Sequence, residues 1–126
     1  EVIAPLRKIK EPFAVNYLAQ VAGVAALDDE EFLRRYVALN RQEREYLYGE
    51  FARLGLRYVP SHTNFILVEV GSQAAEVQER LLAQGVIVRP CGGYDLPDFL
   101  RVSVGSHAQN ARFITALERV LTGTDG

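Results

Sequence analysis

The most constraining feature of the sequence is a short segment, residues 99–104, in which side chains alternate in character. Its two sets are Leu100, Val102 and Val104 on one side and Phe99, Arg101 and Ser103 on the other. Because successive side chains of a β-strand point to opposite faces, the alternation predicts a half-buried strand. A sheet that contains this strand should be covered on one face, and Arg101 should point to the other.

Two helices are expected before the first strand. Apolar residues at helical spacing follow Pro12 and predict a first, mostly buried helix. A second, long helix should begin at a capping box formed by Asp28 and Glu31 and end at Gly55. We expect most charges of this long helix to form a solvated face.

The rest of the chain predicts the remaining elements of an α+β fold. Residues 64–70 form an expected strand, followed by a helix that ends at Gly85 and a strand at 86–89 that Pro90 ends. A capping box at Ser106 opens a closing helix. This order favours helices packed on one face of a small, mostly antiparallel sheet, with the other face available.

Length, charge and cysteine use exclude several classes of partner. The 126 residues suffice for a single compact domain, with loose ends at 1–12 and 122–126. A formal net charge of −2 gives no cationic excess for nucleic acid, and the apolar runs are too short to span a membrane. The single cysteine, Cys91, rules out an intrachain disulfide and favours the reducing cytoplasm.

Arg101 and Arg89 are the candidate ligand-binding residues. Arg101 lies between apolar neighbours, where an unpaired guanidinium is costly to desolvate, so it needs an anionic partner. The residues alone leave open whether this partner is a local carboxylate or a ligand. Arg89 is at the end of the neighbouring expected strand, and a Gly-rich loop connects that strand to the one with Arg101. Arg89 either binds a doubly charged ligand together with Arg101 or extends into solvent.

Four stretches that together span nearly the whole chain carry a family resemblance. They read PFAVN with AQ shortly after it, PSHTNF, GVIVRP and LPDFLRVSVG. In this succession the chain resembles the small domain of class I/II aminotransferases that depend on pyridoxal 5′-phosphate (PLP), specifically their histidinol-phosphate branch. The resemblance implies that residues 1–126 are the C-terminal small domain of a larger enzyme, with 1–12 as an interdomain segment.

The resemblance also implies roles for both arginines. Arg101 would grip a substrate α-carboxylate and Arg89 would face the phosphate of a histidinol-phosphate-like substrate, each through bidentate hydrogen bonds. Two such clamps, at opposite ends of a substrate, would position it over the cofactor. The implied reaction of the parent enzyme converts histidinol phosphate and 2-oxoglutarate to imidazole acetol phosphate and glutamate in histidine biosynthesis.

No catalytic or cofactor-binding residue is expected in this chain. PLP chemistry requires a lysine amine that binds the cofactor and moves a proton, and the chain has only Lys8 and Lys10, outside any lysine loop of the family's type. The resemblance places PLP in an N-terminal large domain that is missing here, and makes the parent a homodimer. We therefore expect the fragment alone to be inactive and to bind no PLP.

The other polar candidates receive minor roles. Asn16 and Tyr94 are candidate minor substrate contacts, although a helix N-cap for Asn16 and surface packing for Tyr94 are the commoner roles. Cys91 has no activating neighbour in sequence. His62 and His107 stand alone, without a partner at metal-ligand spacing, so we expect no metal site.

Two alternative hypotheses remain open at this stage. Another class I/II PLP enzyme, such as an aromatic aminotransferase or a threonine-phosphate decarboxylase, would share the fold and Arg101. A stand-alone α+β module that binds a ligand or mediates dimerisation would instead use the open sheet face without any cofactor domain.

Overall fold

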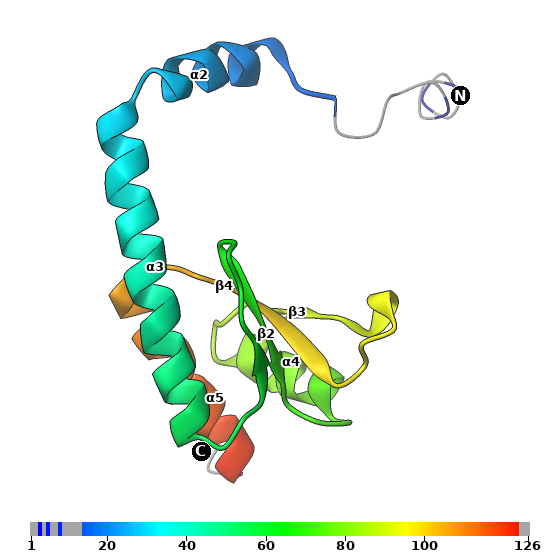
Figure 1. The fold of residues 1–126 in the computed structure, drawn as a ribbon. Helices are drawn as coiled ribbons and strands as arrows, with labels where there is room; N and C mark the ends of the chain where they lie inside the picture. Colours follow the sequence, from blue (N-terminus) through cyan, green and yellow to red (C-terminus); the bar gives the residue numbers. More distant parts are fainter. Residues whose placement is uncertain (1–2, 4, 6–7, 9–13, 124–126) are drawn as a thin grey trace. The chain divides into compact units, whose positions relative to one another are not determined.

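The computed structural model describes residues 3, 5, 8 and 14–123 (Figure 1). It divides the chain into two compact units, Glu1–Arg35 and Tyr36–Gly126. Most of the expected interdomain segment at 1–12, including Lys10 and Pro12, lies outside the described residues. The α+β fold that carries the candidate site belongs to the second unit.

A four-stranded antiparallel sheet forms the centre of the second unit. Its strands are β1 (Tyr58–Val59), β2 (Phe65–Glu69), β3 (Arg89–Pro90) and β4 (Phe99–Ser103). Their order in the sheet is β1-β2-β4-β3, and every neighbouring pair is antiparallel. The structure therefore confirms the predicted antiparallel sheet, with β2 and β4 as its two long central strands.

Helices bury one face of this sheet (Figure 1). They are α3 (Glu30–Arg53, which the second unit includes from Tyr36 on), α4 (Ala74–Ala83) and α5 (His107–Thr122). The sheet contributes Ile66, Val68, Leu100 and Val102 to the core. Because these four alternate with half-buried or exposed residues along β2 and β4, the predicted division of the sheet into a covered and an uncovered face is confirmed.

The first helix, α2 (Tyr17–Leu27), forms as predicted but is not buried. None of its residues is buried, and Leu18 and Leu27 are 78% and 83% exposed. The expectation of a mostly buried helix is wrong for the described residues. Its physical reason is that an 11-residue helix cannot cover its own apolar side chains and needs a packing partner.

Three other expectations need correction. The side chain that caps α3 is Asp29, whose Oδ1 accepts a hydrogen bond from the backbone N of Phe32 at 2.9 Å; Asp28 is instead the C-cap of α2. The expected strand at 86–89 is reduced to Arg89–Pro90, so Pro90 is part of β3 and does not end it. Proline is compatible with β3 because the strand lies at the sheet edge.

Both ends of the closing helix follow local capping rules. Gln109 Oε1 accepts from the backbone N of Ser106 at 2.8 Å, which confirms the predicted capping box. Thr122 is the last residue of α5 and Gly123 its C-cap, so the expected tail at 122–126 overlaps the helix. Among the helices that the structure describes, none combines the length and apolar character needed to cross a membrane.

Candidate anion-binding site

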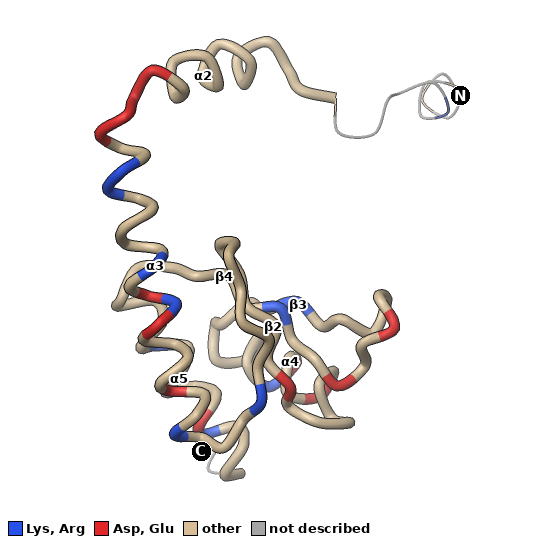
Figure 2. The backbone as a smooth tube through the Cα atoms, viewed as in Figure 1, with Lys and Arg blue, Asp and Glu red and all other residues tan. Residues whose placement is uncertain are grey.

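The register of the sheet brings the two predicted arginines together. Arg89 of β3 lies directly opposite Arg101 of β4. Directly opposite residues of an antiparallel pair share a face, with Cβ atoms about 4.5–5.5 Å apart. Since the neighbours Leu100 and Val102 point into the core, Arg101 and Arg89 stand on the uncovered face, where basic positions of β3 and the adjoining strand lie side by side (Figure 2).

Each arginine is paired with an aromatic ring. The guanidinium carbon of Arg101 lies 5.2 Å from the centre of the Phe65 ring, and that of Arg89 lies 5.4 Å from the centre of the Tyr94 ring. Both distances are in the range of cation–π attraction. A cation–π contact of this kind uses none of the N–H donors of a guanidinium, which can still donate to an anion.

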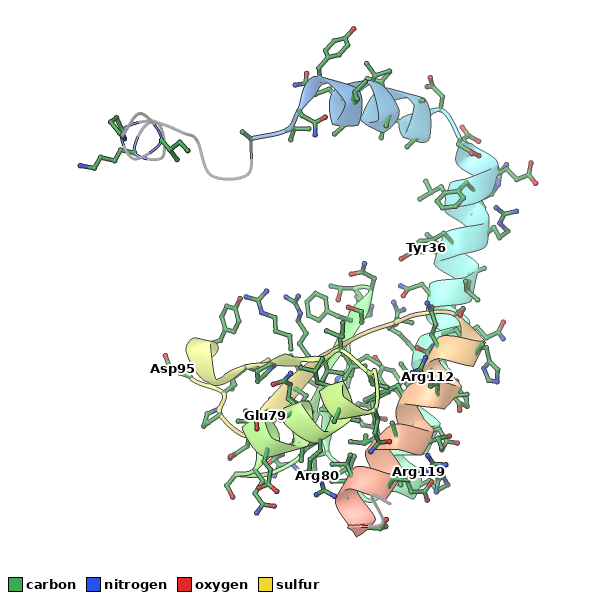
Figure 3. The ribbon with its side chains drawn as sticks, turned by 180° about the vertical axis from the view of Figure 1, so that it is seen from behind. Tyr36, Glu79, Arg80, Asp95, Arg112 and Arg119 are labelled. Carbon is green, nitrogen blue, oxygen red and sulfur yellow. The ribbon has the colours of Figure 1, made fainter. Side chains whose placement is uncertain are left out.

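Neither guanidinium has a carboxylate partner among the described residues. Ion pairs of other arginines in the second unit include those of Arg53 and Arg57, neither of which lies on β3 or β4. Figure 3 shows Arg112 and Arg119 on α5, which packs on the covered side. Two like charges at directly opposite positions attract anions, and two guanidinium groups together have enough donors for an anion with two or more charged oxygens.

Tyr94 and Asn16 have different environments. Tyr94 ends a 3₁₀ turn, Gly92–Tyr94, and is 56% exposed beside Arg89, so its hydroxyl is accessible from the uncovered face. Asn16 is the N-cap of α2, with Oδ1 accepting from the backbone N of Ala19 at 2.9 Å. The N-cap interpretation of Asn16 is confirmed, and a substrate contact of either residue stays a prediction.

The remaining sequence candidates lie away from this pair or lack reactive partners. Cys91 is buried, with Sγ 3.7 Å from the backbone oxygen of Arg89. His107 contacts the buried carboxylate of Glu43 at 3.3 Å. The described residues contain no group of three side chains placed to hold a metal ion.

Sequence reasoning missed two features of this unit. Phe65 was part of a motif but was given no role, although it stacks on Arg101 from a diagonal position on β2. Most charges of the long helix are exposed as expected, but Glu43 is an exception that the sequence did not single out, since it is 1% exposed. Its interruption of the apolar stripe of α3 was the available signal, but its buried partner, Asn110, is 67 residues away.

The second unit does not fit PLP as a self-contained site. Residues 36–126 contain no lysine, so no amine of this unit can bind the cofactor covalently. Lys8 belongs to the other unit, and Lys10 is outside the described residues. What the uncovered face provides is a pair of cationic hydrogen-bond donors, suited to holding a substrate.

Comparisons with known proteins agree with this architecture. The family described as aminotransferase class I and II matches residues 1–117. A histidinol-phosphate aminotransferase of Symbiobacterium thermophilum is 55% identical over 121 residues, which cover 96% of this chain and 34% of that protein. The chain thus spans about a third of the length of the curated relatives it matches.

Two solved structures share the fold. Histidinol-phosphate aminotransferase from Sinorhizobium meliloti, in complex with pyridoxal-5′-phosphate, superposes with a TM-score of 0.78 at 27% identity, over 95% of this chain and 34% of that one. L-threonine-O-3-phosphate decarboxylase from Porphyromonas gingivalis superposes with a TM-score of 0.67 at 26% identity, over 92% of this chain and 37% of that one.

Proposed function

The chain belongs to the class I and II aminotransferase family, and on that premise we propose that it is the C-terminal small domain of a PLP-dependent histidinol-phosphate aminotransferase. The full-length protein exchanges an amino group between histidinol phosphate and 2-oxoglutarate, which yields imidazole acetol phosphate and glutamate in histidine biosynthesis. The observation that carries the proposal is the unneutralised pair of Arg89 and Arg101 on the uncovered sheet face. The 55% identity to a relative of that name supports the choice of substrate.

The two arginines hold the anionic groups of both substrates. Arg101 binds a carboxylate and Arg89 faces a phosphate, because the planar guanidinium matches either group with two parallel hydrogen bonds. Histidinol phosphate has a phosphate but no carboxylate, so it cannot bind to both arginines through these two groups at once. The carboxylate on Arg101 is that of glutamate or 2-oxoglutarate, which uses the site in alternation with histidinol phosphate.

The chemistry itself belongs to parts of the protein outside this chain. PLP, when bound, supplies the electron sink for amino-group transfer, and a lysine of the missing N-terminal large domain supplies the amine that holds it. The present chain binds and orients substrate, which converts the encounter into a reaction of fixed geometry. We further propose a homodimeric, cytoplasmic parent enzyme in which 1–12 connects the two domains and the tail begins after the C-cap of α5 at Gly123.

A decarboxylase that acts on a phosphorylated amino acid is the second candidate. Threonine phosphate carries both a carboxylate and a phosphate, which matches two separate clamps on Arg101 and Arg89. The structural likeness to L-threonine-O-3-phosphate decarboxylase supports this candidate at 26% identity. Histidinol-phosphate aminotransferase is favoured because that named relative is 55% identical to this chain.

The test uses the full-length protein, with histidinol phosphate and 2-oxoglutarate as substrates. Arg101→Gln is expected to raise the KM for 2-oxoglutarate, whose carboxylate Arg101 binds, about 10- to 100-fold and to lower kcat/KM, because a hydrogen bond to a charged group contributes about 1.5–3 kcal/mol. Arg112→Gln is the matched control, since Arg112 lies on α5 and its Nη2 donates to the backbone oxygen of Gln84 at 3.2 Å. An unchanged profile for Arg101→Gln would remove Arg101 from the site.

A parallel assay separates the two candidate functions. Formation of glutamate from 2-oxoglutarate that depends on histidinol phosphate supports the aminotransferase. Release of carbon dioxide from threonine phosphate, without any need for 2-oxoglutarate, would support the decarboxylase and refute the aminotransferase assignment.

A further inference from the structure

A buried carboxylate and a buried amide meet on the covered side of the domain. Glu43 of α3 is 1% exposed and Asn110 of α5 is 2% exposed, and they are the buried polar side chains of the described residues. Asn110 Nδ2 donates to Glu43 Oε2 at 2.9 Å. A buried carboxylate costs free energy even when it is paired, and apolar residues of similar volume would pack there at lower cost. The pair therefore needs an explanation beyond the stability of the core.

Asn110 holds both backbone groups of Gly105. Its Oδ1 accepts from Gly105 N at 3.0 Å, and its Nδ2 also donates to Gly105 O at 3.1 Å. The side chain of Gln109 packs close to Gly105, since a Cβ on Gly105 would lie 2.7 Å from Gln109 Oε1 and 3.1 Å from Gln109 Cβ. Glu43 anchors the amide that makes these contacts, so the end of the β4 segment is fixed to both α5 and α3.

The contacts of Asn110 with Gly105 lie beyond the end of β4, where β4 has β2 as its only paired neighbour among the described strands. The two-residue strand β3 pairs with β4 only at Arg101 and Leu100. Beyond that point, Val102, Ser103 and Gly105 line a hollow of about 380 Å³, whose opposite wall includes residues 85–88. After Arg101, β4 is paired on one side only, with β2 through Val102 and Ser103, and the contacts of Gly105 add a second hold just beyond the strand.

Arg101 is four residues before Gly105 on the same extended segment, about 13 Å away along the strand. A strand transmits a shift of its end along its length, so movement of Gly105 displaces the guanidinium relative to Arg89. We propose that Asn110 and Glu43 are positioning residues for Arg101. They set the place of β4 so that the two arginines face one anion together, an inference that rests on the proposed function.

The test compares steady-state kinetics and thermal stability in the full-length protein, with histidinol phosphate as the amino donor and 2-oxoglutarate as the acceptor. Asn110→Ala removes the hydrogen bonds to Gly105. Glu43→Leu removes the carboxylate that accepts from Asn110 and fills its place in the core with an apolar side chain of similar volume. Both variants should raise the KM for 2-oxoglutarate about 10-fold or more, with a smaller change in kcat, because a small displacement of Arg101 weakens its hydrogen bonds to the substrate carboxylate. Glu43→Gln retains an oxygen that can accept from Asn110 and should restore KM to near the original value.

The matched control is Val120→Ala, which removes core packing on the same helix, α5, at a residue that is 2% exposed. It should lower the Tm without raising KM. The positioning role is overturned if Glu43→Leu is folded and has an unchanged KM, or if Val120→Ala raises KM as much as Asn110→Ala. Arg101→Gln separates the two proposals: an unchanged KM in that variant refutes the proposed function, whereas a raised KM together with normal Glu43→Leu kinetics refutes only the positioning role.

Discussion

Replacement of Arg89 and Arg101 by glutamine, singly and together, should reveal a repulsion between them in the absence of an anion. They lie directly opposite on β3 and β4, and like charges at such positions destabilise a sheet by about 0.2–1 kcal/mol. Arg101→Gln removes that repulsion but also a cation–π contact to Phe65, which contributes about 0.5–1 kcal/mol at an exposed site. The two effects nearly cancel, so the single variant should change the free energy of unfolding little.

A double-mutant cycle isolates the repulsion from the lost aromatic contacts. Urea unfolding of the four proteins gives the coupling free energy between Arg89 and Arg101, in which the separate contacts to Phe65 and Tyr94 cancel. The coupling should be unfavourable at low salt and should shrink in 1 M salt, where the screening length is about 3 Å. A cycle between Arg101 and Arg112 should give no coupling and serves as the control.

Two results would refute this reasoning. A favourable coupling would mean that the side chains share a neutralising group of the chain itself. A loss of about 3 kcal/mol or more for Arg101→Gln alone would show that Arg101 is one partner of a buried internal ion pair. In either case the arginines would be structural, and the anion site would lose its basis.

Three further predictions concern stability. Leu117→Ala should lower the free energy of unfolding by about 2–5 kcal/mol in urea titrations, because Leu117 is fully buried in the core, and a smaller loss would mean that the site collapses around the cavity. Gly49→Ala in α3 should raise the free energy of unfolding by about 0.5–1 kcal/mol, whereas Gly85→Ala should lower it because Gly85 has φ +73°. A change in the same direction for both variants would contradict this prediction. Hydrogen bonding to Arg53 lowers the pKa of Glu118, so this carboxylate contributes stability above its unfolded-state pKa that is lost as the pH falls through its folded-state pKa. Urea titrations across the acid range should therefore show that the free energy of unfolding of Glu118→Gln depends less on pH than that of the original protein. An equal pH dependence in the two proteins would refute the contribution of Glu118.

The elements that sequence predicted correctly are those with local signals. The alternation of residues 99–104 was enough to place Arg101 on the uncovered face, because strand geometry alone fixes which side chains share a face. Helix α5 was predicted from its capping box and apolar stripe, and Gly55 adopts the expected left-handed conformation with φ +70°. In each case a few neighbouring residues determine the conformation.

The features that sequence did not predict depend on partners far along the chain. Strand β1 has two residues, and it exists because Tyr58 and Val59 pair with β2. The apolar residues 86–88 have strand-like composition, yet they do not pair with β4 and instead line the hollow beside it. Periodicity cannot detect either outcome, since both are decided by which backbone groups find a hydrogen-bonding partner.

The cross-strand register adds the most to the functional argument, because it places two separate sequence candidates directly opposite each other, as the proposed site requires. From sequence, Arg89 could equally have reached solvent at a strand end, and only its pairing with Arg101 puts both charges at adjacent positions. Neighbouring like charges lower the stability of a sheet, so their position on the uncovered face is best explained by an anion that neutralises them. The same logic applies to the covered side, where the buried carboxylate of Glu43 is unfavourable by itself and is offset by the backbone geometry that it maintains through Asn110. Both unfavourable arrangements of charge are connected to β4, since Arg101 is part of this strand and Gly105, which Asn110 holds, follows its end, and this is why we connect them in a single functional unit.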